Sequence, residues 1–358
     1  MLSKDNFRTI EPYVPGDQPN FPDMVKLNTN ENPYPPAPGV LRAAEQFRAE
    51  NLKLYPPVDG GELRTAIAEY HGFERECVFV GVGSDDVLSV IFQTCFNSGR
   101  AVIFPEISYS FYEVWGEMYK VPYRKIPLMQ DYTINAEDYI PTGNLDVNGG
   151  VIICNPNAPT AMTTPLDQIE RIVKANSGSV VVVDEAYVDF GGESALPLLK
   201  DYDNLIVVRT FSKSRSMAGL RIGYAISSKT IISAMNDIKN SVNSYTMNRT
   251  AVEIGKASLA EEEYFRNGIS KIVATRTRLV EELDKLGFKT LPSSANFVFT
   301  THTSIKAADI YAALKEKHIY VRYFAKPLID NFLRITVGTG EEIDILLREL
   351  KSITQKVM

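Results

Sequence analysis

Three short segments of this 358-residue chain carry residues whose types and spacing could do chemistry. The first is the turn Gly81-Val82-Gly83-Ser84-Asp85, which joins a predicted strand to a predicted helix. Its small residues let the N–H groups of the helix N-terminus close around an anion such as a phosphate. Taken alone, however, the turn is better explained as a tight connection in which Ser84 or Asp85 caps the helix.

The second segment places a carboxylate at the end of a predicted strand. Asp184 follows the valines at 180–183 and precedes Glu185-Ala186-Tyr187, so it lies at the mouth of a strand that should be buried. An acid in that position costs desolvation free energy unless a cation compensates it. The alternative is that Asp184 caps the next helix, so its interpretation depends on a partner.

The third segment, Arg209-Thr210-Phe211-Ser212-Lys213, follows another predicted strand, and Arg221 comes eight residues later. A lysine at a strand end is usually a solvated surface residue. In combination, however, the segments offer a phosphate cup, a carboxylate for a protonated ring nitrogen, a lysine for imine formation, and Ser plus Arg for a phosphomonoester. These are the groups that a pyridoxal-phosphate site needs.

The elements that must position these residues form a repeating pattern. From about residue 62, strand-length apolar runs that are rich in β-branched residues alternate with helix-like segments. Such strands are apolar on both faces and indicate an α/β fold with a mainly parallel, three-layer sheet, whose ligands bind beyond the carboxyl ends of the strands. The predicted strands are 77–80, 101–104, 151–154, 180–183, 205–208 and 222–225, and the predicted helices include 62–70, 85–96 and 166–175.

The pattern changes after about residue 262. A long amphipathic helix, two strands and two further helices predict a smaller α+β domain there. The chain length also favours two domains. We therefore expect an N-terminal arm over 1–40, a large cofactor-binding domain over 41–262, and a small C-terminal domain over 263–358 that packs with part of the N-terminal segment.

Composition narrows the possible functions. The formal net charge is −6 and no block of Lys and Arg stands out, which argues against a nucleic-acid binder or a polybasic membrane anchor. No segment has the pattern of a signal peptide or of a membrane span, so we expect a cytoplasmic protein with small-molecule partners. We also expect no metal, because the three histidines lack ligand spacing, and buried free thiols at Cys77, Cys95 and Cys154.

The combined motifs resemble the fold-type I pyridoxal-phosphate aminotransferases, and within them the histidinol-phosphate aminotransferases. The resemblance covers nearly the whole chain, with the motifs in the family's order and spacing. It is carried by Ser212-Lys213 with Arg221, Asp184-Glu185-Ala186-Tyr187, Asn155-Pro156-Asn157-Ala158-Pro159-Thr160, Leu27-Asn28-Thr29-Asn30-Glu31-Asn32-Pro33, Lys53-Leu54-Tyr55-Pro56 and Leu333-Arg334-Ile335-Thr336-Val337-Gly338.

The resemblance implies roles for individual residues. Lys213 would form an imine with pyridoxal 5'-phosphate and shuttle a proton during the reaction. Asp184 would pair with the ring nitrogen, and Tyr187 would hydrogen-bond the phenolic oxygen. The remaining cofactor-binding residues would be Ser84, Asp85, Thr210, Ser212 and Arg221 around the phosphate, Tyr55 from a second subunit of a homodimer, and Tyr109 stacked on the ring. Tyr109 could instead be a core aromatic paired with Tyr112.

For the substrate, the resemblance points to Arg334, Arg322 and Asn30. A guanidinium suits both a phosphate and a carboxylate, so Arg334 could serve both half-reactions. Arg322 could instead form a surface salt bridge. The chain departs from the family at one loop, where Ala158 stands in place of an Asn that binds the phenolic oxygen, and Asn157 is expected to substitute for it.

The activity implied is transamination between histidinol phosphate and 2-oxoglutarate, in histidine biosynthesis. An aromatic amino-acid aminotransferase and a threonine-phosphate decarboxylase would share the same cofactor site. A non-catalytic ligand-sensing module of this fold is an alternative from another class, but the full set of catalytic residues argues against it. A nicotinamide-dependent dehydrogenase would need a complete glycine fingerprint, and Gly81-Val82-Gly83 lacks its third small residue.

Overall fold

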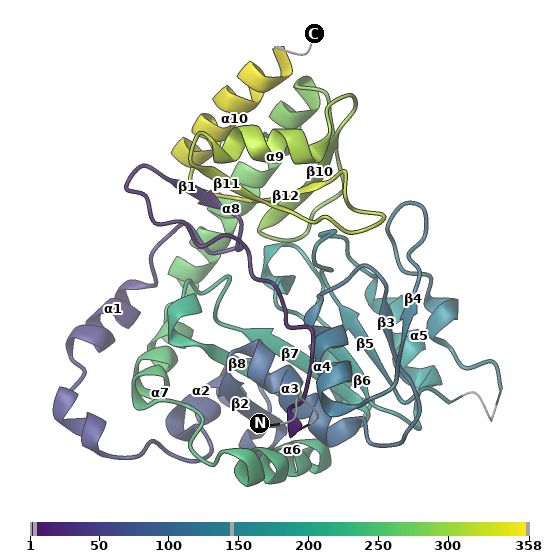
Figure 1. Ribbon diagram of the computed structural model, residues 1–358. Coiled ribbons are helices and arrows are strands. Elements are labelled where there is room, and N and C mark those ends of the chain that lie inside the picture. Colours follow the sequence, from purple (N-terminus) through teal and green to yellow (C-terminus); the bar gives the residue numbers. More distant parts are fainter. Residues whose placement is uncertain (1, 3–5, 144–146, 356–358) are drawn as a thin grey trace.

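Two β-sheets, one above the other, organise the computed structural model, which describes residues 2, 6–143 and 147–355 (Figure 1). The larger sheet has the strand order β2-β8-β7-β6-β5-β3-β4. All its neighbouring strands are parallel except β8, which is antiparallel to both β2 and β7. Its strands are β2 (Val78–Val82), β3 (Val102–Pro105), β4 (Tyr123–Ile126), β5 (Gly150–Cys154), β6 (Val181–Asp184), β7 (Leu205–Thr210) and β8 (Ile222–Ser227). The predicted α/β class with a mainly parallel sheet is confirmed.

Both faces of this sheet are buried, as the β-branched runs predicted. Because side chains alternate along a strand, Val182 and Ile206 pack on one face, whereas Val181 and Val183 pack on the other. Helices α3 (Ser84–Cys95), α4 (Phe111–Tyr119) and α6 (Lys229–Val242) cover the first face. Helices α2 (Gly61–His71), α5 (Leu166–Ala175) and α7 (Arg249–Gly255) cover the second, with α1 (Pro38–Glu45) packed beside α7. Alternate residues of a strand therefore contact different sets of helices, because they face opposite sides of the sheet.

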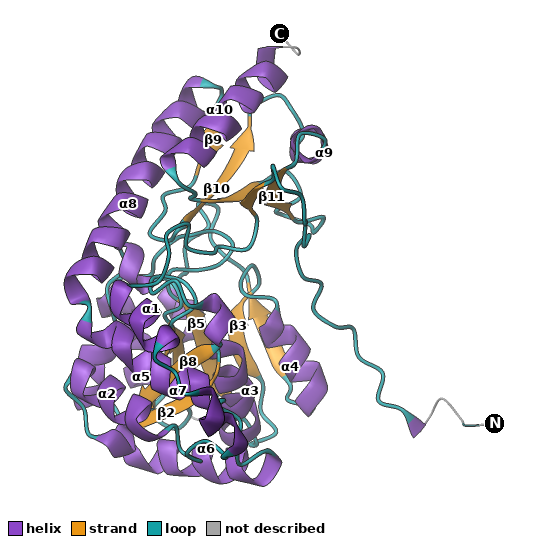
Figure 2. Cartoon of the chain, turned by 90° about the vertical axis from the view of Figure 1, so that its left-hand side faces the viewer, coloured by secondary structure: helices purple, strands orange, loops and turns teal. Residues whose placement is uncertain are grey.

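The smaller sheet contains strands from both ends of the chain. Its order is β1-β11-β12-β10-β9, and β1 (Val25–Leu27) runs parallel to β11 (Ile319–Tyr323). The remaining strands are β9 (Phe288–Thr290), β10 (Phe297–His302) and β12 (Leu333–Thr336), and the helices packed on them are α8 (Glu262–Lys285), α9 (Ala307–Lys315) and α10 (Gly340–Gln355). Helix α8 runs along one side of the molecule from the larger sheet to the smaller one (Figure 2).

This arrangement supports the proposed division into an arm, a large domain and a small domain, whose boundaries at residues 40 and 262 stay a prediction. Residues 1 and 3–5 of the arm, 144–146 of the large domain and 356–358 of the small domain lie outside the described residues. In no described helix is there an apolar stretch long enough to cross a membrane.

The three cysteines are free, but only Cys154 is fully buried. Cys77 and Cys95 are partly exposed, which corrects the expectation that all three would be buried. The reason is their position at the ends of elements, since Cys77 directly precedes the edge strand β2 and Cys95 is the last residue of α3.

Gly223 in β8 allows the turn before α3 to approach the sheet closely. A Cβ on Gly223 would lie 2.2 Å from both the carbonyl carbon of Gly83 and the nitrogen of Ser84. Because those atoms are backbone, they cannot rotate away. We expect Gly223→Ala to lower the free energy of unfolding by about 1–3 kcal/mol, measured by denaturant unfolding. Gly219→Ala is the matched control, because a Cβ there meets nothing within 4 Å. Equal stability of both variants and the wild type would contradict this account.

Candidate active site

A cavity of about 280 Å³ lies between the two sheets, beyond the carboxyl ends of β5, β6 and β7. Residues far apart in the sequence meet here, from the N-terminal arm, the large sheet and the small sheet. The cavity is lined by twelve of the fourteen predicted site residues, namely Asn30, Ser84, Asp85, Tyr109, Asp184, Tyr187, Thr210, Ser212, Lys213, Arg221, Arg322 and Arg334. Tyr55 and Asn157 do not line it.

One end of the cavity gathers groups that bind anions. Helix α3 begins here at Ser84, immediately after Gly83, whose φ of +87° is a left-handed conformation that favours glycine. A Cβ on Gly83 would lie 2.5 Å from the Arg221 guanidinium, so a side chain at this position would block the approach of Arg221. The hydroxyl of Thr210 donates to that of Ser212 at 2.9 Å. A helix N-terminus, two hydroxyls and an arginine are suitable partners for a phosphate.

Asp85 links this end to the aromatic wall. Its carboxylate pairs with Arg221 at 3.2 Å and accepts a hydrogen bond from the Tyr109 hydroxyl at 2.8 Å. These two contacts fix the Tyr109 ring at the edge of the cavity. Tyr109 is thus both a cavity-lining residue and a core aromatic, since its ring also packs edge-on against Tyr112.

Asp184, the last residue of β6, is 3% exposed and accepts two hydrogen bonds. The donors are the Tyr112 hydroxyl at 2.8 Å and the Ala186 amide at 3.2 Å. Burial raises the pKa of the Asp184 carboxyl to about 6. No Lys or Arg of the described residues forms an ion pair with it, so the compensating cation expected from the sequence is not a side chain. A protonated ring nitrogen of a bound cofactor would supply that charge.

Lys213 carries a reactive amine on the same cavity. Its Nζ donates to the carbonyl oxygen of Thr29 at 3.1 Å, and Asn32 donates to the Lys213 carbonyl at 3.0 Å. Burial, together with the positive charge of Arg334, lowers the pKa of the Lys213 ammonium to about 8. The amine is therefore neutral, and nucleophilic, at mildly alkaline pH.

Tyr187 is oriented by Asn30. The Asn30 amide donates to the Tyr187 hydroxyl oxygen at 3.0 Å, so the hydroxyl hydrogen remains available for an acceptor in the cavity. Burial raises the pKa of Tyr187 to about 12, which keeps this hydrogen in place near neutral pH. Asn30 has a left-handed φ of 54° and its backbone N–H donates to Thr336 of the small sheet. Asn30 thus lies in the cavity wall, and its predicted substrate contact stays a prediction.

Two arginines face each other on the small-sheet wall. Arg322 of β11 and Arg334 of β12 are directly opposite in the strand register. Like charges in this position destabilise a sheet unless an anion binds between them. Arg334 donates to the Asn28 carbonyl at 2.8 Å, but its buried Nε has no partner among the described residues. Arg322 donates to the backbone carbonyls of Val14 and Pro15 in the arm, and no described carboxylate pairs with it.

The two predicted residues outside the cavity have other partners. The Asn157 amide donates to the Ile107 carbonyl and to the Thr160 hydroxyl, both at 2.9 Å, and accepts from Ser108 at 2.8 Å. The Asn157 side-chain amide therefore already donates its hydrogen bonds within the protein. Its expected contact with a phenolic oxygen stays a prediction. Tyr55 is 76% exposed and stacks on Tyr245, with ring centroids 4.5 Å apart.

Sequence reasoning missed several aromatic residues of the site, among them Tyr112, Tyr13 and the cavity-lining Phe324. Tyr112 is completely buried and donates to Asp184, although its spacing from Tyr109 had indicated only core packing. Tyr13, in the Pro-rich arm, lines the cavity and stacks on Phe111 at 4.4 Å. The alternation within β6 could have pointed to Tyr112, because it places Asp184 on the face covered by α4. Nothing in the pattern of the arm pointed to Tyr13.

The residues present fit pyridoxal phosphate. The cavity has an anion-binding end, a buried carboxylate without a cationic partner, a neutralisable lysine and a phenol with a free hydrogen. Each of these groups matches a different part of the cofactor, namely its phosphate, its ring nitrogen, its aldehyde carbon and its phenolic oxygen.

Comparisons with known proteins agree with this geometry. The family model "Aminotransferase class I and II" matches residues 22–350. A histidinol-phosphate aminotransferase of Lactococcus lactis subsp. cremoris (strain SK11) is 48% identical over 351 residues, which cover 98% of this chain and 97% of that protein. A protein of the same name from Clostridium botulinum (strain Kyoto / Type A2) is 46% identical over 350 residues, covering 98% of each chain.

Solved structures give the same result. The crystal structure of histidinol-phosphate aminotransferase from Sinorhizobium meliloti in complex with pyridoxal-5'-phosphate superposes with a TM-score of 0.84 and 26% identity, over 93% of this chain and 91% of that one. The histidinol-phosphate aminotransferase from Clostridium acetobutylicum also gives a TM-score of 0.84, with 25% identity, over 92% of this chain and 99% of that one. On the strength of the family model and these relatives, the chain belongs to the class I and II aminotransferase family.

Proposed function

We propose that this chain is a pyridoxal-phosphate-dependent enzyme that transfers the amino group of L-histidinol phosphate to 2-oxoglutarate, yielding imidazole-acetol phosphate and L-glutamate in histidine biosynthesis. The observation that carries the proposal is one cavity that joins Lys213 and Asp184 to the facing arginines Arg322 and Arg334. The first pair serves amino-group chemistry, and the second pair serves an anionic substrate. The names of the Lactococcus and Clostridium relatives support this choice of substrate.

Pyridoxal phosphate, when bound, supplies an electrophilic carbon for the amino group and an electron-withdrawing ring. Lys213 Nζ would hold the cofactor covalently and, once released by the incoming amine, move the proton at the substrate α-carbon. Asp184 would hold the proton on the ring nitrogen, since the carboxylate is buried where a positive charge is favoured. Tyr187 would donate its free hydrogen to the phenolic oxygen. Ser84, Thr210, Ser212 and Arg221 would hold the phosphate.

Arg334 is proposed to bind both substrates in turn. Histidinol phosphate carries a phosphate where glutamate carries its α-carboxylate, so one guanidinium with an unpartnered Nε could receive either anion. Arg322 would add a second positive charge when its contacts with Val14 and Pro15 are exchanged for substrate. The stack of Arg334 against Phe297 and Phe324 holds its guanidinium plane in a fixed direction.

We further propose that the chain works as a homodimer, in which Tyr55 completes the phosphate site of the partner. Exposed apolar side chains occur near Tyr55 and its stacking partner Tyr245 in the sequence, namely Leu52, Leu54 and Val242. Exposed apolar side chains that gather on one surface indicate an interaction site. The buried ammonium of Lys239 donates to the carbonyls of both Val58 and Ser244 and thereby ties the two loops together. The cytoplasmic location stays a prediction.

The lowered pKa of Lys213 gives a first test. In the cofactor-free protein, acylation of Lys213 should rise with pH around a midpoint near 8, because the amine is neutral above that pH. Lys229 is an internal control, since the carboxylate of Glu74 raises the pKa of its ammonium. Mass spectrometry of both peptides across pH measures the two profiles.

Borohydride reduction of the cofactor-loaded protein tests the covalent attachment. It should abolish the visible band and modify the Lys213 peptide, and modification elsewhere would overturn the proposed attachment.

Substrate assays test the rest of the proposal. The protein should turn over histidinol phosphate with 2-oxoglutarate faster than it turns over phenylalanine, tyrosine or threonine phosphate. Arg334→Gln should lower kcat/KM by about 100-fold for both histidinol phosphate and 2-oxoglutarate, because each loses a charge-assisted hydrogen bond. Arg348→Gln, at an exposed position on α10, is the control that should keep wild-type values. A loss confined to one substrate would rule out the shared role of Arg334.

Mixing two inactive variants tests the dimer. If Tyr55 serves the partner's cavity, subunits carrying Lys213→Ala and subunits carrying Tyr55→Ala should complement each other after unfolding and refolding together. Half of the randomly formed dimers are then mixed, and each has one intact site, so about a quarter of the wild-type activity should return. A monomer in sedimentation analysis, or no recovery of activity on mixing, would contradict the proposal.

A further inference from the structure

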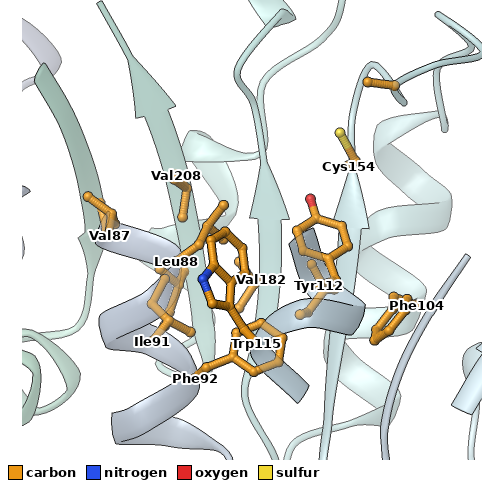
Figure 3. Close-up of a cluster of buried hydrophobic side chains, with 14 of the residues drawn as sticks. Val87, Leu88, Ile91, Phe92, Phe104, Tyr112, Trp115, Cys154, Val182 and Val208 are labelled. Carbon is orange, nitrogen blue, oxygen red and sulfur yellow. The ribbon is translucent and has the colours of Figure 1, made fainter. Parts of the chain in front are cut away.

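The hydroxyl of Tyr112 is the only donor side chain that reaches Asp184 among the described residues. Tyr112 belongs to α4, is 0% exposed, and donates to Asp184 Oδ2 at 2.8 Å. In the core beneath the cavity its ring lies near Phe104, and its hydroxyl points toward the strand end that carries Cys154 (Figure 3). This oxygen therefore lies in an apolar cluster, where its polar contacts are the Asp184 carboxylate and the Cys154 thiol.

The register of the strands explains why this contact forms. Cys154 and Asp184 are paired residues of β5 and β6, and both follow residues, Ile152 and Val182, that face α4. Because side chains alternate along a strand, Asp184 points to the same face. The first turn of α4 covers that face and presents Tyr112 to the carboxylate. The same segment supplies Tyr109, so one short stretch of chain contacts both Asp184 and the cavity.

The direction of the hydrogen bond has a chemical consequence. Burial raises the pKa of Tyr112 well above its ordinary value, so this phenol stays protonated and acts as the donor. A hydrogen bond given to a carboxylate stabilises its ionised form. Burial acts in the opposite sense and is the larger effect, so the pKa of Asp184 is raised to about 6 even though the Tyr112 hydrogen bond lowers it. Without that bond, Asp184 would be protonated at a higher pH.

We propose that Tyr112 is a positioning residue for Asp184, whose hydroxyl holds this carboxylate ionised and directed at the ring nitrogen of the cofactor. The inference rests on the proposed function, because it assigns Tyr112 a part in the same site. Packing alone does not account for the hydroxyl, since a Phe at this position would fill nearly the same volume without a buried polar atom.

Other groups that face Asp184 act in different ways. Among the described residues, no side chain other than Tyr112 donates a hydrogen bond to Asp184. The backbone amide of Ala186 also lowers the pKa of Asp184, whereas the carboxylates of Asp85 and Glu185 raise it. The remaining titratable neighbours are the Cys154 thiol and the Tyr187 phenol, whose own pKa values Asp184 raises.

Tyr112→Phe tests the proposal because it removes one oxygen and keeps the ring. In holoenzyme prepared with ¹⁵N-labelled pyridoxal phosphate, we expect the ring-nitrogen resonance of this variant to move toward the unprotonated position. The acid limb of the kcat/KM profile should shift to higher pH, since Asp184 then loses its charge earlier as the pH falls. Near neutral pH kcat/KM should drop about tenfold, with KM for histidinol phosphate little changed.

Tyr139→Phe is the matched control. Tyr139 is 1% exposed, and its hydroxyl is likewise buried, but it has no hydrogen-bond partner among the described residues and lies in another hydrophobic cluster. This variant should keep the wild-type nitrogen resonance and pH profile. A second test adds Tyr112→Phe to Asp184→Asn, where the two losses should combine to less than their product, because Tyr112 acts through Asp184.

The outcomes distinguish a failure of the proposed function from a failure of the role of Tyr112 alone. A wild-type protein that shows no visible cofactor band would overturn the proposed function and this inference with it. A normal band in Tyr112→Phe, with the nitrogen resonance and acid limb of the wild type, would overturn only the role of Tyr112. The role of Tyr112 would also be overturned if the loss of kcat/KM in the double variant equalled the product of the two single losses.

Discussion

The burial of the Asp184 carboxylate is the constraint on which the site depends. A charged group at the end of a strand inside the core is unfavourable unless other groups compensate it. The described residues supply two hydrogen bonds to Asp184, from Tyr112 and Ala186, and none of their positively charged side chains pairs with it. Binding of the proposed cofactor would therefore compensate this buried charge as well as enable the chemistry. Stabilisation of the site and its proposed activity would then arise from the same contact.

Positively charged side chains also line the cavity, namely Lys213, Arg322 and Arg334. The positive charge of Arg334 disfavours the charged form of Lys213, and Arg322, which faces Arg334 on the neighbouring strand, disfavours the charged form of Arg334. Burial and this repulsion together lower the pKa of Lys213, and neither arginine forms an ion pair with a described carboxylate. In the proposed function, the cofactor would bind Lys213 and the anionic group of the substrate would bind the two arginines.

Much of this could be predicted from the sequence, and the reasons for success and failure are physical. The central strands were predictable because they are apolar on both faces. Asp184 and Lys213 were predictable because they lie at or just after the end of such a strand, and Arg221 because it directly precedes one. Strands β4, β9 and β11, with exposed or mixed side chains, carried no comparable pattern. The contact of Tyr112 with Asp184 depends on which face of β6 meets α4, which requires the topology. The role proposed for Tyr55 would depend on a partner chain, which a single sequence does not describe.

The pairing of β1 with β11 has a consequence for how the molecule is made. Val25 lies opposite Ile319, so β1 has no partner in its sheet until β11 has left the ribosome. Contacts of such long sequence separation form late, because closing the loop between them is entropically costly. The large sheet, whose strands all lie between residues 78 and 227, can assemble earlier. The wall that carries Arg322 and Arg334 would then be the last part of the site to form, and a nascent chain would acquire its cofactor chemistry before its substrate selectivity.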